Sequence, residues 1–399
     1  MKKENTLLII FAFINFTHLL DFMIMMPLGD LFMRIFKITP QQFSFLVSSY
    51  TISAGVAGFF SAFYVDKFDR KTALLLNYAG FCLGTLSCAF AKSFEVLLIA
   101  RSITGIFGGV IGAMIIAIIS DVFPYERRGF AMGVLTAGFS VAAVIGVPAG
   151  LYLALKMDWH FPFILIGSMG IILGLVLWKV MPSMNEHVVQ SDKKFDNPIL
   201  LMRDIVTDRN QRLALSLNFT IVVGQFLLIP FISQYLIRNV GLNQEQIPMV
   251  YLVGGLFTIF TMPLIGKLTD RLGAMKIFIT VLLISIIPFV LITNLPKVSI
   301  VTALMVTTAF FIFGSGRMVP AQTITTAVVP PQKRGSFMSI RASVQQLGTA
   351  MASLLSGFMV TSTTTGPLLG YNYVGFLAVG VSCITLFIAP KLKVVKQIV

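Results

Sequence analysis

DKFDRK at residues 66–71 and DRLG at residues 270–273 are short charged stretches that each separate two long apolar runs. Lys276 follows the second stretch, so basic residues accompany the aspartates in both. Asp66 and Asp270 lie 204 positions apart, and each joins the second apolar run of its half of the chain to the third. Matching charged turns at matching places predict a duplicated bundle of helices.

A second pair of stretches gives almost the same offset. PYERRGFAM at residues 124–132 aligns with PPQKRGSFM at residues 330–338, which is 206 positions further on. Two landmarks with nearly one offset indicate two homologous halves. Because each half holds an even number of apolar runs, both halves have the same orientation. Parallel repeats of this kind are related by an axis along the membrane normal, with the substrate path between them.

The composition is that of a chain surrounded by lipid. Of the 399 residues 56% are hydrophobic and 12% are charged, and the mean hydropathy is +0.89, whereas soluble domains carry about 25% charged residues. About 20 apolar residues cross a bilayer as a helix, and long runs that are apolar all round favour helices over strands. We therefore predict an all-α integral membrane protein with twelve transmembrane helices. The expected spans are 6–27, 43–65, 72–91, 96–118, 129–153, 161–181, 213–236, 246–266, 276–295, 299–320, 336–361 and 370–390.

The longest polar segment divides these spans into two groups of six. We expect an N-terminal six-helix bundle at 1–181, a cytoplasmic linker at 182–212 and a C-terminal six-helix bundle at 213–399. Of the 30 Lys and Arg residues, 22 lie at the ends expected to be cytoplasmic and six at the opposite ends. This asymmetry predicts cytoplasmic N- and C-termini in a multi-pass protein of the plasma (inner) membrane. The net charge of +14 is thereby explained by topology and membrane lipid, and it does not indicate nucleic-acid binding.

Asp21 is the acidic residue that lies well inside an expected span, and an ionisable group at membrane depth is a functional candidate. Arg101, in the fourth span, lies at about the same depth, roughly six residues from the outer end of its span. We predict that Asp21 and Arg101 couple transport to protons, because burial favours the neutral acid while a nearby guanidinium favours the carboxylate. The alternative is a fixed pair that only ties the first span to the fourth.

The charged stretches resemble the loop 2–3 signature of the major facilitator superfamily, Gly-x-x-x-Asp-Arg/Lys-x-Gly-Arg-Arg/Lys, and the resemblance extends over essentially the whole chain. The second half keeps Gly266, Asp270, Arg271 and Gly273. The first half keeps Asp66, Lys67, Arg70 and Lys71 but has Ala62 and Asp69 where the family usually has glycine. An aspartate tolerates a left-handed backbone better than most residues, so we expect the tight turn at Asp69 to persist.

Within the superfamily the chain resembles the twelve-span drug:proton antiporters and the sugar-efflux permeases. The fourth span reads Arg101-x-x-x-Gly105-x-x-Gly108-Gly109, and the fifth contains GVPAG at residues 146–150. The latter is similar to an exporter motif, although Val147 separates Gly146 from Pro148 and Leu151 follows Gly150. The resemblance implies a monomer with a central cavity, alternating access and export.

The resemblance also implies gating residues at the cytoplasmic helix ends. A carboxylate there can pair with Arg127 or Arg128, or face the N-terminus of another helix, and the alternative is a set of solvated charges worth little each. The gating candidates are Asp66, Arg70, Lys71, Arg128, Asp270 and Arg271. The hinge candidates, which could equally serve helix packing, are Gly146, Pro148 and Gly150.

Neutral polar side chains inside the spans are the candidates for substrate binding. They are Tyr50, Asn218, Gln225, Gln345 and Gln346. Arg317, near the inner end of the tenth span, is interpreted as snorkelling to the interface, with an anionic substrate group as the alternative.

These features predict a secondary active transporter that exports a small organic molecule by proton antiport. Proton-coupled uptake of a nutrient, or a sensor of the same fold that transports nothing, are the alternatives. We find no Walker loop of the form Gly-x-x-x-x-Gly-Lys-Ser/Thr, no metal spacing among the three histidines, and no nucleophile constellation. We therefore expect no enzyme activity, no metal and no cofactor, with the proton gradient as the driving force.

Overall fold

The computed structural model describes residues 2–61, 68–123, 125–184, 207–329, 334–363 and 366–393. Within these ranges the regular structure is helical, apart from one isolated β-bridge between Thr361 and Leu369. In lipid every backbone amide needs a partner inside the protein, and a helix supplies that partner within one segment. The long apolar runs therefore form helices, and the predicted all-α class is confirmed.

The chain divides into two compact units. Unit 1 comprises Met1–Met25 and Ser49–Pro198, and unit 2 comprises Met26–Ser48 and Ile199–Val399. The segment Met26–Ser48 follows the first helix in sequence but is compact with the second unit, so α3 (Pro40–Ser61) passes from one unit to the other. The predicted domain boundaries at residues 181 and 213 stay a prediction.

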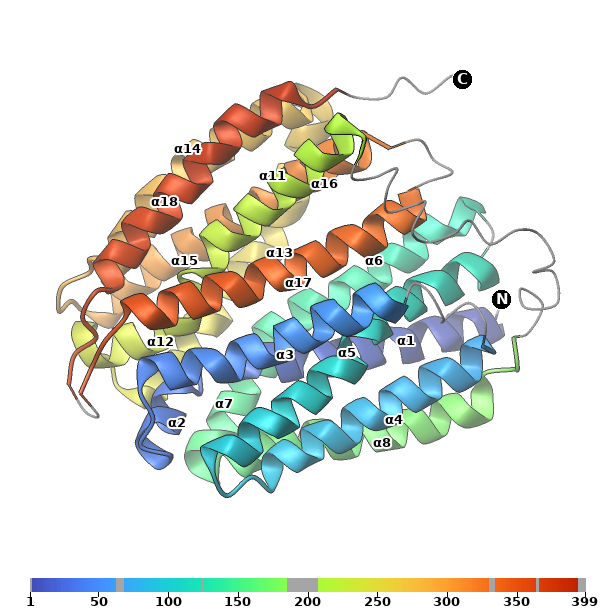
Figure 1. The fold of residues 1–399 in the computed structure, drawn as a ribbon, viewed down its shortest axis with the longest axis horizontal. Helices are drawn as coiled ribbons and strands as arrows, with labels where there is room; N and C mark the ends of the chain where they lie inside the picture. The colour runs from blue at the N-terminus through green and yellow to red at the C-terminus, as the bar shows by residue number, and fades with distance from the viewer. Residues whose placement is uncertain are drawn as a thin grey trace. The chain divides into compact units, whose positions relative to one another are not determined.

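Unit 1 is a bundle in which α4 packs against both α5 and α8, while α1 packs against α6 and α8 (Figure 1). Two of its helices, α4 and α5, begin at polar caps: the Asp69 side chain accepts a hydrogen bond from the Thr72 N–H, and the Ser93 hydroxyl accepts one from the Val96 N–H. Besides part of α3, the helices are α1 (Lys2–Ile24), α4 (Arg70–Ala89), α5 (Phe94–Val122), α6 (Tyr125–Val141), a π-helical turn (Ala142–Gly146), α7 (Val147–Lys156) and α8 (His160–Val180).

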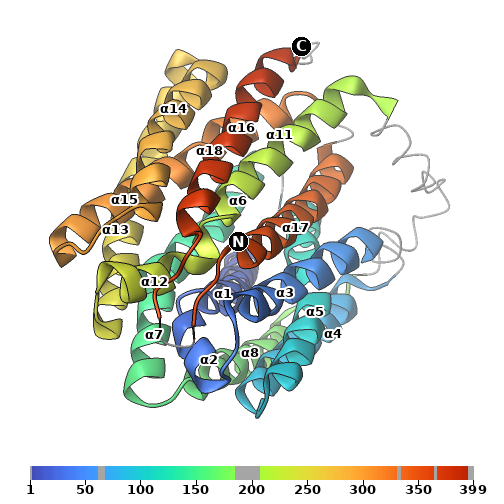
Figure 2. The same ribbon diagram turned by 60° about the vertical axis from the view of Figure 1, so that its left-hand side comes forward.

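Unit 2 packs α13 and α14 against α15, and α11 against α17 and α18 (Figure 2). Gly273 has φ +91°, a backbone angle that L side chains rarely adopt, so glycine is required in the turn between α13 and α14. The helices are α2 (Gly29–Ile35), α11 (Arg209–Phe226), α12 (Ile232–Tyr235), α13 (Ile247–Leu272), α14 (Ala274–Thr293), α15 (Ile300–Gly316), α16 (Met318–Thr326), α17 (Arg334–Met359) and α18 (Tyr371–Ile388), with short 3₁₀ or π turns at Ile229–Phe231, Leu236–Val240, Gln244–Gln246 and Ala389–Lys391.

Eleven helical segments among the described residues are long and apolar enough to cross a membrane. The run predicted at 336–361 forms most of α17, a helix of 26 residues, but it is too polar to be among the eleven. Its polar residues include Arg341, Ser343, Gln345, Gln346, Thr349, Ser353 and Ser356. Eleven of the twelve predicted spans therefore correspond to such segments, and the count of twelve stays a prediction.

Large apolar side chains cover the outside of these helices. Leu76, Phe90, Phe260 and Phe387 are each at least two-thirds exposed, and soluble proteins rarely expose contiguous apolar surface on this scale. The chain is therefore an integral, multi-pass membrane protein, as predicted from its composition.

Candidate functional site

The Asp21 carboxylate and the Arg101 guanidinium form a fully buried ion pair in unit 1. Arg101 Nη1 lies 2.7 Å from Asp21 Oδ2, and both residues are 0% exposed. The Thr85 hydroxyl, on α4, donates to Asp21 Oδ1 at 3.1 Å. The sequence predicts that Asp21 and Arg101 lie close together, and the structure joins them directly. Their role in proton coupling stays a prediction.

Glycines on α5 bring the α3 backbone close to this pair. A Cβ on Gly105 would lie 2.3 Å from the carbonyl oxygen of Tyr50, and one on Gly109 would lie 2.2 Å from that of Ala54. Such contact between backbones is what small residues permit in membrane helices. It places the Tyr50 ring 4.4 Å from the guanidinium carbon of Arg101, a cation–π contact.

Two polar side chains beside the pair have no hydrogen-bond partner among the described residues. They are His18, at both ring nitrogens, and Tyr50, at its hydroxyl. Both approach Gly108, where a Cβ would lie 2.6 Å from Tyr50 Oη and 3.3 Å from His18 Nε2. Buried polar atoms without partners are costly, so this part of unit 1 is suited to a polar guest or to water.

The other predicted substrate residues lie in unit 2. Asn218 accepts a hydrogen bond from Arg341 Nε at 3.0 Å. Gln225 is buried, and its Oε1 has no partner in the described part of the chain. Gln345 is exposed and Gln346 is half-buried on α17. The structure thus links Tyr50 to the ion pair of unit 1 and links Asn218 to a second arginine in unit 2.

The predicted gating residues behave differently from one another. Asp66 and the side chain of Arg128 lie outside the described residues. Arg70 Nε lies 3.1 Å from Asp121 Oδ2, and Lys71 is half-buried. Asp270 and Arg271 are exposed at the end of α13 and make no ion pair with the described residues. Their gating roles stay predictions.

Arg127, named as a possible partner for Asp66, pairs with the start of α1. Its Nη1 lies 2.7 Å from Glu4 Oε2, and its Nη2 donates to Asn5 Oδ1 at 3.0 Å. This contact ties α6 to α1 at the end of unit 1 that the sequence assigns to the cytoplasm.

Asp69 does not have the left-handed backbone expected for it, because its φ is −53°. It is the N-cap of α4, and its carboxylate accepts hydrogen bonds from Thr72, from the Met184 N–H at 2.5 Å and from the Ser183 hydroxyl at 3.2 Å. Partial burial opposes the charged form, but these hydrogen bonds outweigh it, so the pKa of Asp69 lies below its ordinary value. At this position, where the family usually has glycine, the Asp69 carboxylate binds Ser183 and Met184, which follow α8.

The predicted hinge coincides with a π-helical turn, Ala142–Gly146, in which the Val147 N–H donates to the Ala142 carbonyl. Pro148 follows and has no N–H to continue the ordinary pattern. Gly146 and Gly150 accept side chains of α1: a Cβ on Gly146 would lie 2.8 Å from Leu20, and one on Gly150 would lie 2.9 Å from Ile24. These residues therefore serve packing, and their motion stays a prediction.

Arg317 does not snorkel to the interface, and this interpretation of the sequence was wrong. Its side chain is 0% exposed, and Nη1 donates to Ser382 Oγ at 2.8 Å while Nη2 donates to the Ile221 carbonyl at 3.2 Å. The guanidinium carbon lies 4.7 Å from the centre of the Phe289 ring. Packing between α11, α14 and α18 holds the side chain inside unit 2.

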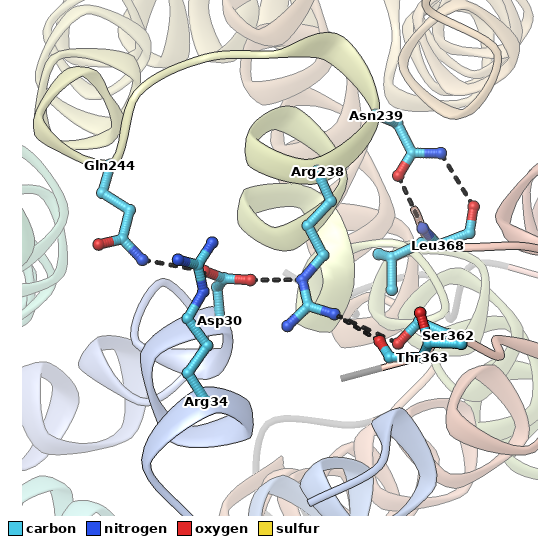
Figure 3. A network of polar contacts seen from close by, with 8 residues as sticks. All are labelled: Asp30, Arg34, Arg238, Asn239, Gln244, Ser362, Thr363 and Leu368. Atoms are coloured by element: carbon cyan, nitrogen blue, oxygen red, sulfur yellow. Dashed lines mark hydrogen bonds and ion pairs between the residues drawn. The ribbon is translucent and has the colours of Figure 1, made fainter. Parts of the chain in front are cut away.

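Asp30, on α2, is a second buried acid, and the sequence prediction missed it. Figure 3 shows its polar contacts. It is 1% exposed and accepts from Arg238 Nε at 2.5 Å and from Gln244 Nε2 at 2.9 Å, while Arg34 Nε lies 2.8 Å away. Arg238 also donates to Ser362 Oγ and to the Thr363 carbonyl, each at 3.3 Å. This set of contacts, here called the Asp30 latch, joins three connecting segments of unit 2.

Sequence patterns gave little signal for the residues that were missed. Asp30 follows the first span directly and is not inside it, so it is indistinguishable from a loop acid. Thr85 and Asp121 carry no spacing rule that links them to Asp21 or Arg70. Their partners lie on other helices, Asp21 on α1 and Arg70 on α4, and only the tertiary packing identifies them.

A bundle of lipid-facing helices around a buried ion pair is the architecture of a membrane transporter. The chain belongs to the Major Facilitator Superfamily, because the profile of that family matches residues 11–221 and 214–396.

Relatives and solved structures agree with this membership. The uncharacterized MFS-type transporter YceJ of Bacillus subtilis is 25% identical over 360 residues, covering 90% of each chain. The multidrug resistance protein MdtG of Escherichia coli is 27% identical over 374 residues, covering 90% of this chain and 86% of MdtG. A bacterial homolog of the human lysosomal transporter Spinster is 18% identical with a TM-score of 0.76, covering 98% of both chains. A D-xylose-proton symporter is 14% identical with a TM-score of 0.75, covering 98% and 99%. The two solved structures show the fold alone.

Proposed function

We propose that this transporter exports a small organic molecule in exchange for protons. The observation that carries the proposal is the buried Asp21–Arg101 pair, with the Thr85 hydroxyl on the second carboxylate oxygen. An ionisable residue at membrane depth is expensive and therefore marks function.

A proton on Asp21 would change the electrostatics of unit 1 without moving an atom far. With the carboxylate charged, the pair is neutral as a whole. Protonation leaves the Arg101 guanidinium without a counter-charge, and breaking a buried pair in this way costs about 3–5 kcal/mol. The cost favours a state in which Arg101 meets water or a substrate, and a ligand or proton that prefers one state shifts the equilibrium toward it.

The partnerless atoms of His18 and Tyr50 support a guest beside the pair. A polar group of the substrate, or water that replaces it, would satisfy them when bound near Gly108. Substrate and proton would then compete around the same cation, which is the simplest physical basis for exchange.

Two observations favour export over uptake. GVPAG at residues 146–150 resembles the exporter motif and forms a π-helical turn and a proline-containing helix start. The relative MdtG is described as a multidrug resistance protein. We further propose a monomer in the plasma (inner) membrane with no cofactor.

The Asp30 latch is proposed to act as a gate during alternating access. It fastens α2, which follows the first span, to residues of unit 2. The positive-inside pattern assigns Arg34 and Arg238 to the outer face. We therefore propose that the latch opens when the transporter faces outward.

The test uses the purified protein in phosphatidylcholine vesicles with the pH dye pyranine inside. Benzoate, phenyl phosphate, ethidium and D-xylose are added in turn under an imposed pH gradient. We expect at least one of these probes to move protons, and Asp21→Asn to abolish that flux while Asp158→Asn, in an exposed loop, preserves it. Accumulation in inverted vesicles would establish export.

Three outcomes would contradict the proposal. Asp21→Asn that still drives substrate against a pH gradient would remove the coupling role. Accumulation in right-side-out vesicles alone would establish uptake. The absence of proton flux with every probe would favour a sensor.

A further inference from the structure

Two arginines of unit 2, Arg317 and Arg341, lie in a long stretch of sequence that has no acidic side chains. The last carboxylate of the sequence is Asp270, so residues 271–399 contain no Asp or Glu. Arg317 and Arg341 both lie in this stretch. In unit 1, by contrast, the buried Arg101 has Asp21 as its counter-charge.

The repeat aligns a neutral residue of the second half with Asp21 of the first. At the offset of 204 that relates the two charged turns, Asp21 corresponds to Gln225. Gln225 is buried on α11, and its Oε1 has no partner among the described residues. The position that carries a charge in the first half thus carries a neutral amide in the second.

The hydrogen bonds of Arg317 do not replace a counter-ion. The guanidinium has five N–H donors, and in the described part of the chain they bond to the Ser382 hydroxyl and to the Ile221 carbonyl. Nε has no partner in the described part of the chain. Neutral acceptors and the Phe289 ring leave the positive charge uncompensated, and buried charges are ordinarily paired.

The surroundings of Arg317 contain further groups able to hold an anionic ligand. A Cβ on Gly314 would lie 3.2 Å from Gln225 Nε2 and 3.3 Å from the Phe289 ring, so the amide and the ring both lie next to Gly314. Asn218, which accepts a hydrogen bond from Arg341 of α17, lies one turn of α11 from Ile221, whose carbonyl accepts one from Arg317. Two cations, an amide and an aromatic ring therefore gather along one stretch of α11.

We propose that Arg317 binds the anionic group of the transported molecule, which is an organic anion such as an aromatic carboxylate or phosphate. The anion supplies the negative counter-charge that Arg317 lacks. Gln225 contacts the polar atoms of the anion, and Phe289 packs on its apolar part. Arg317 is fully buried in this structure, so the anion reaches it when unit 2 opens in the transport cycle. The proposal rests on the proposed transport function and names its substrate class.

The test measures equilibrium binding, which needs no proton gradient. Full-length protein in nanodiscs of phosphatidylcholine is titrated at constant pH with benzoate and phenyl phosphate. Benzyl alcohol and benzylamine share the aromatic ring but are neutral or cationic. We expect only the two anions to raise the unfolding temperature in a saturable way. Arg317→Gln should weaken anion binding at least tenfold, while Lys276→Gln, exposed on α14, should leave it unchanged.

Arg317→Lys is the control for a loss of folding. It keeps the positive charge, so it should keep part of the affinity for the anion. Equal binding of benzylamine and benzoate, or unchanged benzoate affinity in Arg317→Gln, would overturn the proposal. An Arg317-dependent stabilisation that requires phosphatidylglycerol in the nanodisc would overturn it also, since the anion would then be a lipid headgroup. Anion binding without proton flux would support this inference while contradicting proton coupling, so the two failures are distinguishable.

Discussion

Removing the Asp30 carboxylate should release α2 from the rest of unit 2. Asp30→Ala leaves the Arg238 side chain, 3% exposed, with two neutral acceptors at 3.3 Å among the residues that the structure describes. Breaking a buried pair from one side costs about 3–5 kcal/mol. The Arg34 pair contributes at most about 1 kcal/mol, because Arg34 is 47% exposed. Almost all of the effect should therefore come through Arg238.

This cost converts into a population of opened molecules. Since about 1.4 kcal/mol is a factor of ten in an equilibrium constant, 3–5 kcal/mol corresponds to a rise of about 100- to 4,000-fold in the opened fraction. Gln234 is the natural reporter, because it is 0% exposed and its Nε2 lies under Gly29 of α2. In a background without native cysteines, Gln234→Cys should be labelled by a membrane-impermeant thiol reagent in proportion to opening.

The assay compares labelling rates in right-side-out and inverted vesicles. Asp30→Ala should accelerate labelling from the outer face by about 100-fold or more, whereas Arg34→Gln should change it by less than about fivefold. The double variant Asp30→Ala with Arg238→Met should be labelled more slowly than Asp30→Ala alone, because no buried charge is left unpaired. An unchanged rate in Asp30→Ala, additive effects in the double variant, or labelling from the cytoplasmic face alone would refute the reasoning.

Three further perturbations follow from local geometry. Asp69→Ala should lower the free energy of unfolding in detergent by about 0.5–2 kcal/mol at pH 7, through loss of an N-cap. Because the folded pKa is depressed, the part of this stabilisation that depends on the charge is present above the unfolded value of about 3.9 and is lost as the pH falls through the folded pKa, so the two proteins should differ less in unfolding temperature at pH 3 than at pH 7. Gly273→Ala should destabilise by about 1–3 kcal/mol, since φ is +91°, and an unaltered unfolding temperature would contradict that backbone conformation. Gly109→Ala should cost more than Gly112→Ala, because its Cβ would meet the Ala54 carbonyl at 2.2 Å whereas nothing lies within 4 Å at Gly112; equal unfolding temperatures of the two variants would argue against the close contact of α3 and α5.

Hydropathy and charge were enough to predict the helices, because lipid imposes one solution on each apolar run. The prediction of α17 as a span was the least direct, since its polar residues dilute the apolar signal. The proximity of Asp21 and Arg101 was predictable because two charges inside apolar spans are rare and lay at similar depths. Rarity and depth are both readable from a sequence.

The other contacts could not be predicted from the sequence, because they depend on the rotation of each helix about its own axis. Arg317 was interpreted as an interfacial residue from its distance to the end of the tenth span, but the helix is interrupted there, between α15 and α16, and the side chain points inward. Asp69 was judged by the glycine it replaces, whereas its carboxylate bonds to residues more than 110 positions away. Asp30 was passed over because burial of a loop acid depends on partners 208 and 214 positions distant.

The absence of Asp and Glu after Asp270 has a consequence for how the charge of this molecule depends on pH. All three histidines, His18, His160 and His187, also precede residue 271. Arginine and lysine stay protonated across the physiological range, so the charge of residues 271–399 is constant while that of the earlier residues varies. A change of pH on either side of the membrane therefore alters the charge of the earlier residues, while the final third of the chain keeps its positive charge.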